Sequence, residues 1–230
     1  MKPLKAMVLT ACAVLLAACN AGGEGHGAAV VQGPAGILAN IETSNLDSDQ
    51  FPWSSIADGR LKRWHYEADG LIPVNTHGNA LAEAAIDEIE SRLGLVIFDR
   101  DSIALIPDED ITRGLIVSEG TALGPYGMVD ENTCGMVSGG VGTTAYPADF
   151  LNEQGNINTV LWVHLSSPAC AASLAVAIHE FGHALGMGEH FEGFGYGDAI
   201  DANFWNVLYN IYNNNVGATR DELVITQVAF

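Results

Sequence analysis

The sequence predicts an α+β domain with a mixed, mostly parallel twisted sheet. Three features support this fold class: short runs rich in β-branched and aromatic residues, a long amphipathic helix pattern set among them, and a second, strongly apolar helix pattern after them. Of the 230 residues, 48% are hydrophobic, which is enough for one domain with its own core and leaves little room for a second. We therefore expect a single ordered domain over residues 51–230.

The N-terminal residues 1–18 have the pattern of an export signal. Two lysines precede an apolar run from Ala6 to Ala18, which is too short to span a membrane comfortably. The run leads into LAAC, residues 16–19, which resembles the lipobox of bacterial lipoproteins; ordinary cleavage after a small residue is the alternative. The resemblance implies lipid on Cys19, a membrane anchor in the bacterial cell envelope and, with Asn20 next, placement at the outer membrane.

Residues 19–50 are rich in glycine, alanine, serine, asparagine and aspartate and show no sustained period. This composition predicts a flexible tether between the anchor and the domain. The whole chain carries 9 Lys and Arg against 28 Asp and Glu, a formal net charge of -19. Because this charge repels phosphate backbones, it argues against nucleic acid as a partner.

Four cysteines are present, and the export signal accounts for two of them. Cys12 leaves with the signal and Cys19 carries the lipid, so Cys134 and Cys170 remain in an oxidising compartment. We expect these two to form a disulfide. The alternative, two thiolate metal ligands, lacks the C-x-x-C spacing.

Within the domain, a strand is expected to end at Pro73-Val74, and a helix to follow from Ala80 to Leu93. Apolar residues recur every four positions on one face of this helix, Asn79 is a suitable N-cap, and Gly94 ends the pattern. Short β-rich runs bounded by Gly, Asp and Pro predict further strands. These runs are GLVIFDR (94–100), IALIP (103–107), RGLIVSEG (113–120) and NTVLWVHLS (158–166).

A glycine-rich stretch from Met128 to Asn156 is expected to be an irregular loop. Its four acidic residues could bind a structural calcium ion, although they fit no calcium-loop motif; a solvated acidic loop is the alternative. These residues are Asp130, Glu131, Asp149 and Glu153.

Pro168 then predicts the start of a helix that runs to Gly186 and is apolar nearly all round. His179, Glu180 and His183 lie in this helix, where polar groups are costly unless they have partners. The two histidines are four residues apart and face the same side, so both can ligate one zinc ion. Glu180 is adjacent to that face, where it could act as general base on a metal-activated water.

The string HEFGHALG, residues 179–186, resembles the catalytic helix of metzincin zinc peptidases, in particular matrixin-like members, whose pattern is H-E-x-x-H-x-x-G-x-x-H. The resemblance implies a metzincin-like fold over residues 51–230, with a long first helix and a central zinc-binding helix. It also implies a zinc-dependent endopeptidase that hydrolyses protein or peptide substrates. By the same resemblance, an extended substrate would pair with the strand containing Trp162 to Leu165.

The sequence departs from the family pattern at the third ligand. Glu189 stands where the family has its third histidine, and His190 follows one residue later. We favour His190, because it preserves a three-histidine site and the segment 186–188, Gly-Met-Gly, is flexible enough to absorb one extra residue; Glu189 is the alternative ligand. Asp198 and Asp201 are further alternatives that lack the expected helix motif.

A second departure is the family's methionine turn, since no methionine follows Met187. NVLYNIY, residues 206–212, resembles this turn with Leu208 in the methionine's place. Tyr209 or Tyr212 could hydrogen-bond a substrate, and residues 219–222 have the spacing of a capping box that predicts a closing helix. Because of both departures, a lipoprotein that binds zinc or peptides without catalysis is the alternative function.

Overall fold

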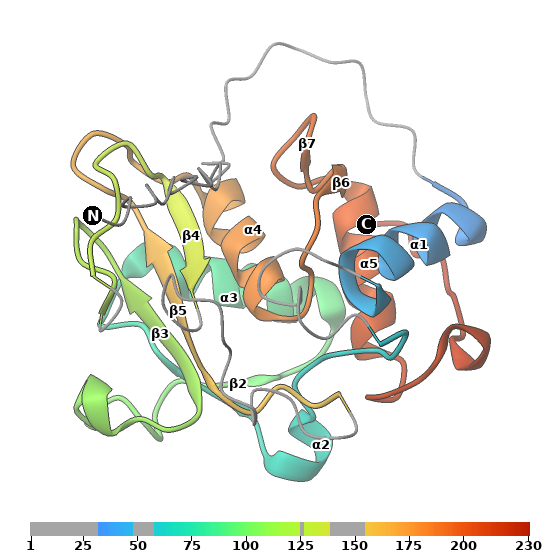
Figure 1. Ribbon diagram of the computed structural model, residues 1–230, viewed down its shortest axis with the longest axis horizontal. Helices are drawn as coiled ribbons and strands as arrows, with labels where there is room; N and C mark the ends of the chain where they lie inside the picture. The colour runs from blue at the N-terminus through green and yellow to red at the C-terminus, as the bar shows by residue number, and fades with distance from the viewer. Residues whose placement is uncertain (1–31, 48–57, 125–126, 139–154) are drawn as a thin grey trace, which may run out of the picture.

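A five-stranded mixed sheet organises the chain, in the order β2-β1-β3-β5-β4 (Figure 1). The computed structural model describes residues 32–47, 58–124, 127–138 and 155–230. Neighbouring strands are parallel except at β4, which pairs antiparallel with β5 and forms an edge of the sheet. The strands are β1 (Ile72–Asn75), β2 (Phe98–Asp99), β3 (Gly114–Ser118), β4 (Gly135–Ser138) and β5 (Val160–Leu165). The prediction of a mixed, mostly parallel sheet is confirmed.

Two helices, α3 (Ala80–Leu93) and α4 (Leu174–Ala184), pack against each other beside the sheet (Figure 1). The side chain of Asn79 accepts hydrogen bonds from the first turn of α3, and Gly94 ends the helix in the left-handed conformation at φ 65°. Ile86 and Ile89 are fully buried in the main core. Both ends of α3 therefore lie where the sequence predicted them.

The opposite face of the sheet carries a smaller apolar cluster, and here one expected strand is absent. Residues 103–107 form turns before the short helix η2 (Asp108–Asp110) instead of a strand. The carboxylate of Asp99 starts these turns by accepting hydrogen bonds from the backbone N–H groups of Asp101 and Ser102, at 2.9 and 3.0 Å. The cluster consists of Ile103, Ile111, Ile116, Leu123, Val129 and Trp162.

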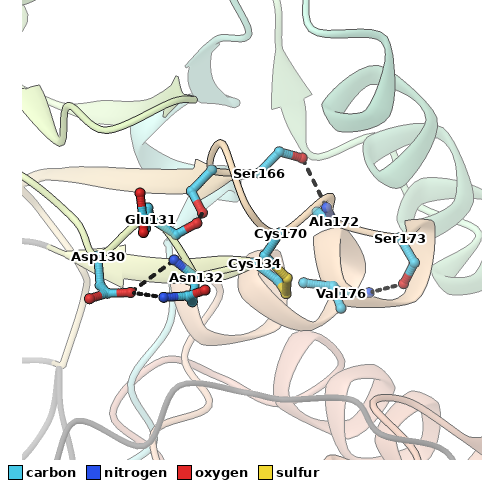
Figure 2. The surroundings of a disulfide bond; sticks show 10 residues. Asp130, Glu131, Asn132, Cys134, Ser166, Cys170, Ala172, Ser173 and Val176 are labelled. Carbon is cyan, nitrogen blue, oxygen red and sulfur yellow. Dashed lines mark hydrogen bonds between the residues drawn. A yellow bond between two sulfur atoms is a disulfide. The ribbon is translucent and has the colours of Figure 1, made fainter.

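The predicted disulfide between Cys134 and Cys170 is present (Figure 2). It lies just before helix α4, whose predicted start is wrong. Helix α4 was expected to begin at Pro168 but begins at Leu174, because residues 167–170 form a turn in which the N–H of Cys170 donates to the Ser167 carbonyl. The hydroxyl of Ser173 caps the helix by accepting from the N–H of Val176 at 3.2 Å. The disulfide thus ties the segment before α4 to the start of the edge strand β4.

A tether was expected over residues 19–50, but residues 34–46 of that range are helical, which corrects the expectation for this part; residues 19–31 and 48–50 lie outside the described chain. Helix α1 (Pro34–Ile41) and the π-helix η1 (Glu42–Leu46) follow one another, and α1 packs on α5 (Ala202–Tyr212) (Figure 1). Ile37, Ile41 and Leu46 are buried in the main core. Their burial joins this segment to the domain, although its glycine- and asparagine-rich surroundings showed no period.

Residues 1–31, which include the expected export signal and Cys19, lie outside the described part of the chain. Among the described helices, none has the length and apolar character needed to cross a bilayer.

Four further short elements complete the described domain. They are α2 (Tyr66–Asp69), the paired strands β6 (Phe191–Glu192) and β7 (Gly195–Tyr196), and η4 (Arg220–Glu222). The capping box between Thr219 and Glu222 is confirmed, but the helix it begins is a single 3-10 turn. Residues 223–230 have no regular secondary structure and end beside α5 (Figure 1).

Candidate metal centre

Three histidines converge on one point at the end of α4. His179 and His183 lie one helical turn apart on α4, and His190 comes from the segment that follows it. The Nε2 atom of His179 lies 3.1 Å from that of His183 and 3.1 Å from that of His190, and the remaining pair is 3.2 Å apart. Among the described residues, this is the group of histidine, cysteine and acidic side chains that could hold a metal ion.

The spacing of these nitrogens fits a tetrahedral metal. Metal–nitrogen bonds of about 2.0–2.1 Å at tetrahedral angles would separate the ligand nitrogens by about 3.3–3.4 Å, close to the separations observed. In two of the three rings, the other nitrogen has a hydrogen-bond partner. His179 Nδ1 donates to the Ala199 carbonyl at 3.0 Å, and His183 Nδ1 to the Met187 carbonyl at 2.6 Å. These bonds fix the tautomer that turns the Nε2 lone pairs of both residues towards the common point.

Burial keeps the three imidazoles in the neutral state that binds metals. Desolvation is the main cause that lowers the pKa of His179 to about 4, and it also lowers the pKa values of His183 and His190. Protonated imidazoles so close together would also repel one another. The cluster is therefore uncharged near neutral pH and can accept a cation without first releasing protons.

His190, which the sequence favoured, joins this cluster, whereas Glu189 does not belong to it. The chain turns at Gly186, whose φ of 123° is available mainly to glycine, before it reaches His190, and Gly188 donates its N–H to the Ser44 carbonyl at 2.5 Å. Neither Asp198 nor Asp201 belongs to the cluster either.

Asp201 has a structural role instead. Its carboxylate caps α5 by accepting from the backbone N–H of Asn203 at 2.6 Å.

Glu180 follows His179 on α4 and is buried, with 2% of its surface exposed. Desolvation raises the pKa of its carboxyl group to about 8. The side chain packs against β4 at Gly135, where a Cβ atom would lie only 2.6 Å from Glu180 Oε1. A carboxyl group whose pKa lies near neutral pH can accept a proton and return it, and here it follows His179 directly in the chain.

The floor of the cluster is an aromatic ring that the sequence analysis missed. Phe194 is fully buried, and its ring centroid lies 4.3, 4.7 and 5.4 Å from the ring centroids of His179, His183 and His190. Behind it, the ring of Phe204 on α5 lies at 5.4 Å. The sequence feature that could have indicated this contact is the run of aromatic residues and glycines over residues 191–199, directly after His190.

The expected methionine-like turn at residues 206–212 is wrong, because these residues belong to helix α5. Leu208 is buried in the main core on this helix. Tyr212 is buried and donates its hydroxyl to the Leu185 carbonyl at 3.2 Å, while the ring of Tyr209 packs near Phe230. Both tyrosines therefore have structural contacts in place of the substrate contacts considered for them.

The strand expected to accept a substrate is not at the edge of the sheet. Residues 162–165 lie in β5, which pairs with β3 on one side and with β4 on the other. The strand at this edge of the described sheet is β4. It has four residues and lies within the glycine-rich stretch 128–156, which was expected to be irregular.

The calcium expectation receives no geometric support from the residues described. Asp130 is exposed, and its carboxylate accepts from the backbone N–H and the side-chain amide of Asn132, both at 2.8 Å (Figure 2). Asp149 and Glu153 lie outside the described residues.

The fold and the cluster define an α+β protein with a three-histidine centre that could hold a metal ion. No protein-family model, curated protein or solved structure matches the chain.

Proposed function

We propose that the chain is a zinc-dependent endopeptidase of the metzincin type. The observation that carries this proposal is the convergence of the Nε2 atoms of His179, His183 and His190 within 3.1–3.2 Å of one another, with the buried Glu180 next to His179 on the same helix. Three neutral imidazoles are a protein ligand set typical of catalytic zinc, which keeps its fourth position for water or substrate. The match between HEFGHALG and the metzincin helix supports the choice of zinc and of peptide hydrolysis.

In this proposal each residue has a separate task. The three histidines hold the ion, and the carbonyls of Ala199 and Met187 fix the orientation of two of the rings. Zinc bound there supplies Lewis-acid polarisation of the scissile carbonyl and makes water more acidic. Glu180 accepts a proton from the attacking water and passes it to the leaving amine, so no covalent intermediate with the protein is needed.

The substrate is an extended protein or peptide segment that pairs with β4. This strand is the sheet edge nearest the centre, because Gly135 touches Glu180, and strand addition at such an edge supplies main-chain hydrogen bonds. The resemblance implied docking at β5. Because β5 already pairs with a strand on each side, we propose docking at β4 instead.

The test compares Glu180→Gln with Glu189→Gln in the zinc-loaded full chain. We expect Glu180→Gln to retain one zinc per chain and to lose peptide hydrolysis by at least about 100-fold, as removal of a general base does. Glu189→Gln should keep both properties, since Glu189 is outside the cluster. Undiminished turnover in metal-loaded Glu180→Gln would remove Glu180 from this role.

The second candidate is a lipoprotein that binds zinc or peptides without cutting them. Two observations favour it: the third histidine lies one residue late in the family pattern, and residues 206–212 form part of helix α5 in place of the family's methionine turn. Stoichiometric zinc combined with no cleavage of any member of a diverse peptide library would select this candidate.

We also propose that Cys19 carries lipid and anchors the protein in the bacterial cell envelope. Incorporation of labelled fatty acid into the wild-type chain in a Gram-negative host, and its loss in Cys19→Ala, would support the anchor. Equal labelling of both chains would refute it.

A further inference from the structure

Asn206 and Asn210 on α5, together with Asn214 two residues beyond its end, hold the C-terminal segment by its main chain. They recur every four residues, and each pairs with one alternate residue of the segment through two hydrogen bonds, as one peptide group pairs with another in a sheet. The side-chain oxygen accepts the N–H of the segment residue at 2.7–2.8 Å, and the side-chain nitrogen donates to its carbonyl at 2.7–3.1 Å. The pairs are Asn206 with Val228, Asn210 with Thr226 and Asn214 with Val224.

The three amides are oriented by the helix itself. Each uses its second N–H to donate to the carbonyl four residues earlier, at 2.8 Å: Asn206 to Ala202, Asn210 to Asn206, and Asn214 to Asn210. The remaining N–H and the oxygen of each amide are thereby directed outward at the segment. This arrangement reduces the entropy lost when an extended chain binds, because the recognising groups are already in place.

The spacing of the asparagines matches an extended chain over a limited length. Four residues of α-helix rise about 6 Å, whereas two residues of a strand advance about 6.6–6.8 Å. Three pairs tolerate this small mismatch. Four residues before Asn206 stands Ala202, and α5 ends at Tyr212, so the set is limited to three asparagines.

Val224 is 70% exposed, and Thr226 is also exposed, although both pair with asparagines through their backbones, so these contacts depend little on their side chains. Between and beyond the paired residues, Leu223, Ile225 and Phe230 pack against the main core. The anchor at the end is aromatic: the ring of Phe230 lies 6.3 Å from that of Trp205 and 6.2 Å from that of Tyr209.

We propose that the asparagine row formed by Asn206, Asn210 and Asn214, on α5 and just beyond its C-terminal end, is a binding site for extended polypeptide. It reads the main chain at three alternate residues and takes an aromatic side chain two residues after the last of them. The segment Val224–Phe230 is its resident ligand, and the same segment supplied in trans exchanges with it. The site shares no residue with the histidine cluster, so it does not depend on the proposed peptidase function.

The experiment uses the full chain with a specific protease site inserted between Glu222 and Leu223, so that the protein folds intact and is then cut. We expect the released segment to remain bound through gel filtration and to exchange with a fluorescent synthetic peptide of residues 223–230, followed by anisotropy. A peptide N-methylated at Thr226 loses the bond to Asn210 and should bind more weakly, on the order of tenfold. A peptide with Thr226→Val should bind as well as the parent, since that side chain is exposed.

Asn210→Asp and Asn213→Asp form a matched pair of protein variants. Asn213 makes the same bond to the carbonyl four residues earlier, Tyr209, but its side chain is exposed and pairs with no segment residue among the bonds described. Asn210→Asp should weaken peptide binding on the order of tenfold or more, because a carboxylate cannot donate to the Thr226 carbonyl. Immediate loss of the cut segment, equal binding of the N-methylated peptide, or equal behaviour of the two variants would each overturn the proposal.

Discussion

The side chain of Glu180 on α4 lies against the backbone of Gly135 on β4, so closely that a Cβ atom at residue 135 would come within 2.6 Å of Glu180 Oε1 and 2.7 Å of its Cγ. The backbone of Gly135 has an ordinary φ, so the glycine is needed for space and not for its conformational freedom. The edge strand therefore limits where the carboxyl group of Glu180 can lie.

Gly135→Ala should displace the Glu180 carboxyl group and lower peptide turnover by about 100-fold, since displacements of about 1 Å have such effects on catalysis. Zinc stoichiometry should be unchanged, because the histidines do not move. Gly33→Ala is the control, since a Cβ there meets no atom within 4 Å. Steady-state kinetics with metal analysis measures both, and wild-type turnover in Gly135→Ala would contradict this reading.

His190→Ala should abolish tight metal binding, whereas Glu189→Ala should leave it intact. The first change removes one of three nitrogen donors, and its cost should exceed the about 10–100-fold loss produced by altering a ligand's hydrogen-bond partner. Competition with a chromophoric chelator measures the affinity. If Glu189→Ala were the variant that lost metal, the third ligand would be misassigned.

Phe194→Ala should lower the free energy of unfolding by about 3–5 kcal/mol, the usual cost of removing a buried aromatic ring. Urea unfolding of the metal-free protein measures this without involving activity. Tyr196→Ala provides a comparison, because that ring is near His190 but 55% exposed, and we expect a change within about 0.5 kcal/mol. Similar losses for both variants would show that Phe194 does not support the cluster.

Removing the disulfide should destabilise the domain by about 2–4 kcal/mol, since it closes a loop with a sequence separation of 36 residues. The double variant Cys134→Ala/Cys170→Ala should show this loss in urea unfolding. Reductant should shift the wild-type transition to the same midpoint and leave the double variant unaffected. A further shift of the double variant would indicate that the reductant acts elsewhere.

The sequence predicted the elements that are determined by residues close to them in the chain. Helix α3 was predicted with both ends, because its apolar period, the Asn79 cap and Gly94 all agree. The disulfide followed from the cysteine count and the expected compartment, and two histidines of the cluster followed from their spacing. His190 was preferred over Glu189 by ligand chemistry and by the glycine beside it, and the structure brings it to the cluster.

Features that depend on distant contacts were missed or misplaced. Strand β4 is only four residues long, begins with glycine, and is held by pairing with β5 and by the disulfide. Helix α1 has little periodicity of its own and is stabilised by packing on α5. Phe194 acquires its place under the histidines from the turn between β6 and β7, which no helix or strand period reveals. Tertiary packing, which a single sequence does not display, determined each of these.

The whole histidine cluster comes from residues 179–190, a short and contiguous stretch of chain. Closing a loop of this size costs little entropy, so a bound ion would stabilise a local turn without drawing remote parts of the molecule together. The long-range pairing of β3 with β5 would still depend on the apolar core. Chelation should therefore accelerate amide hydrogen exchange in a narrow footprint around this stretch, while the central strands keep their protection.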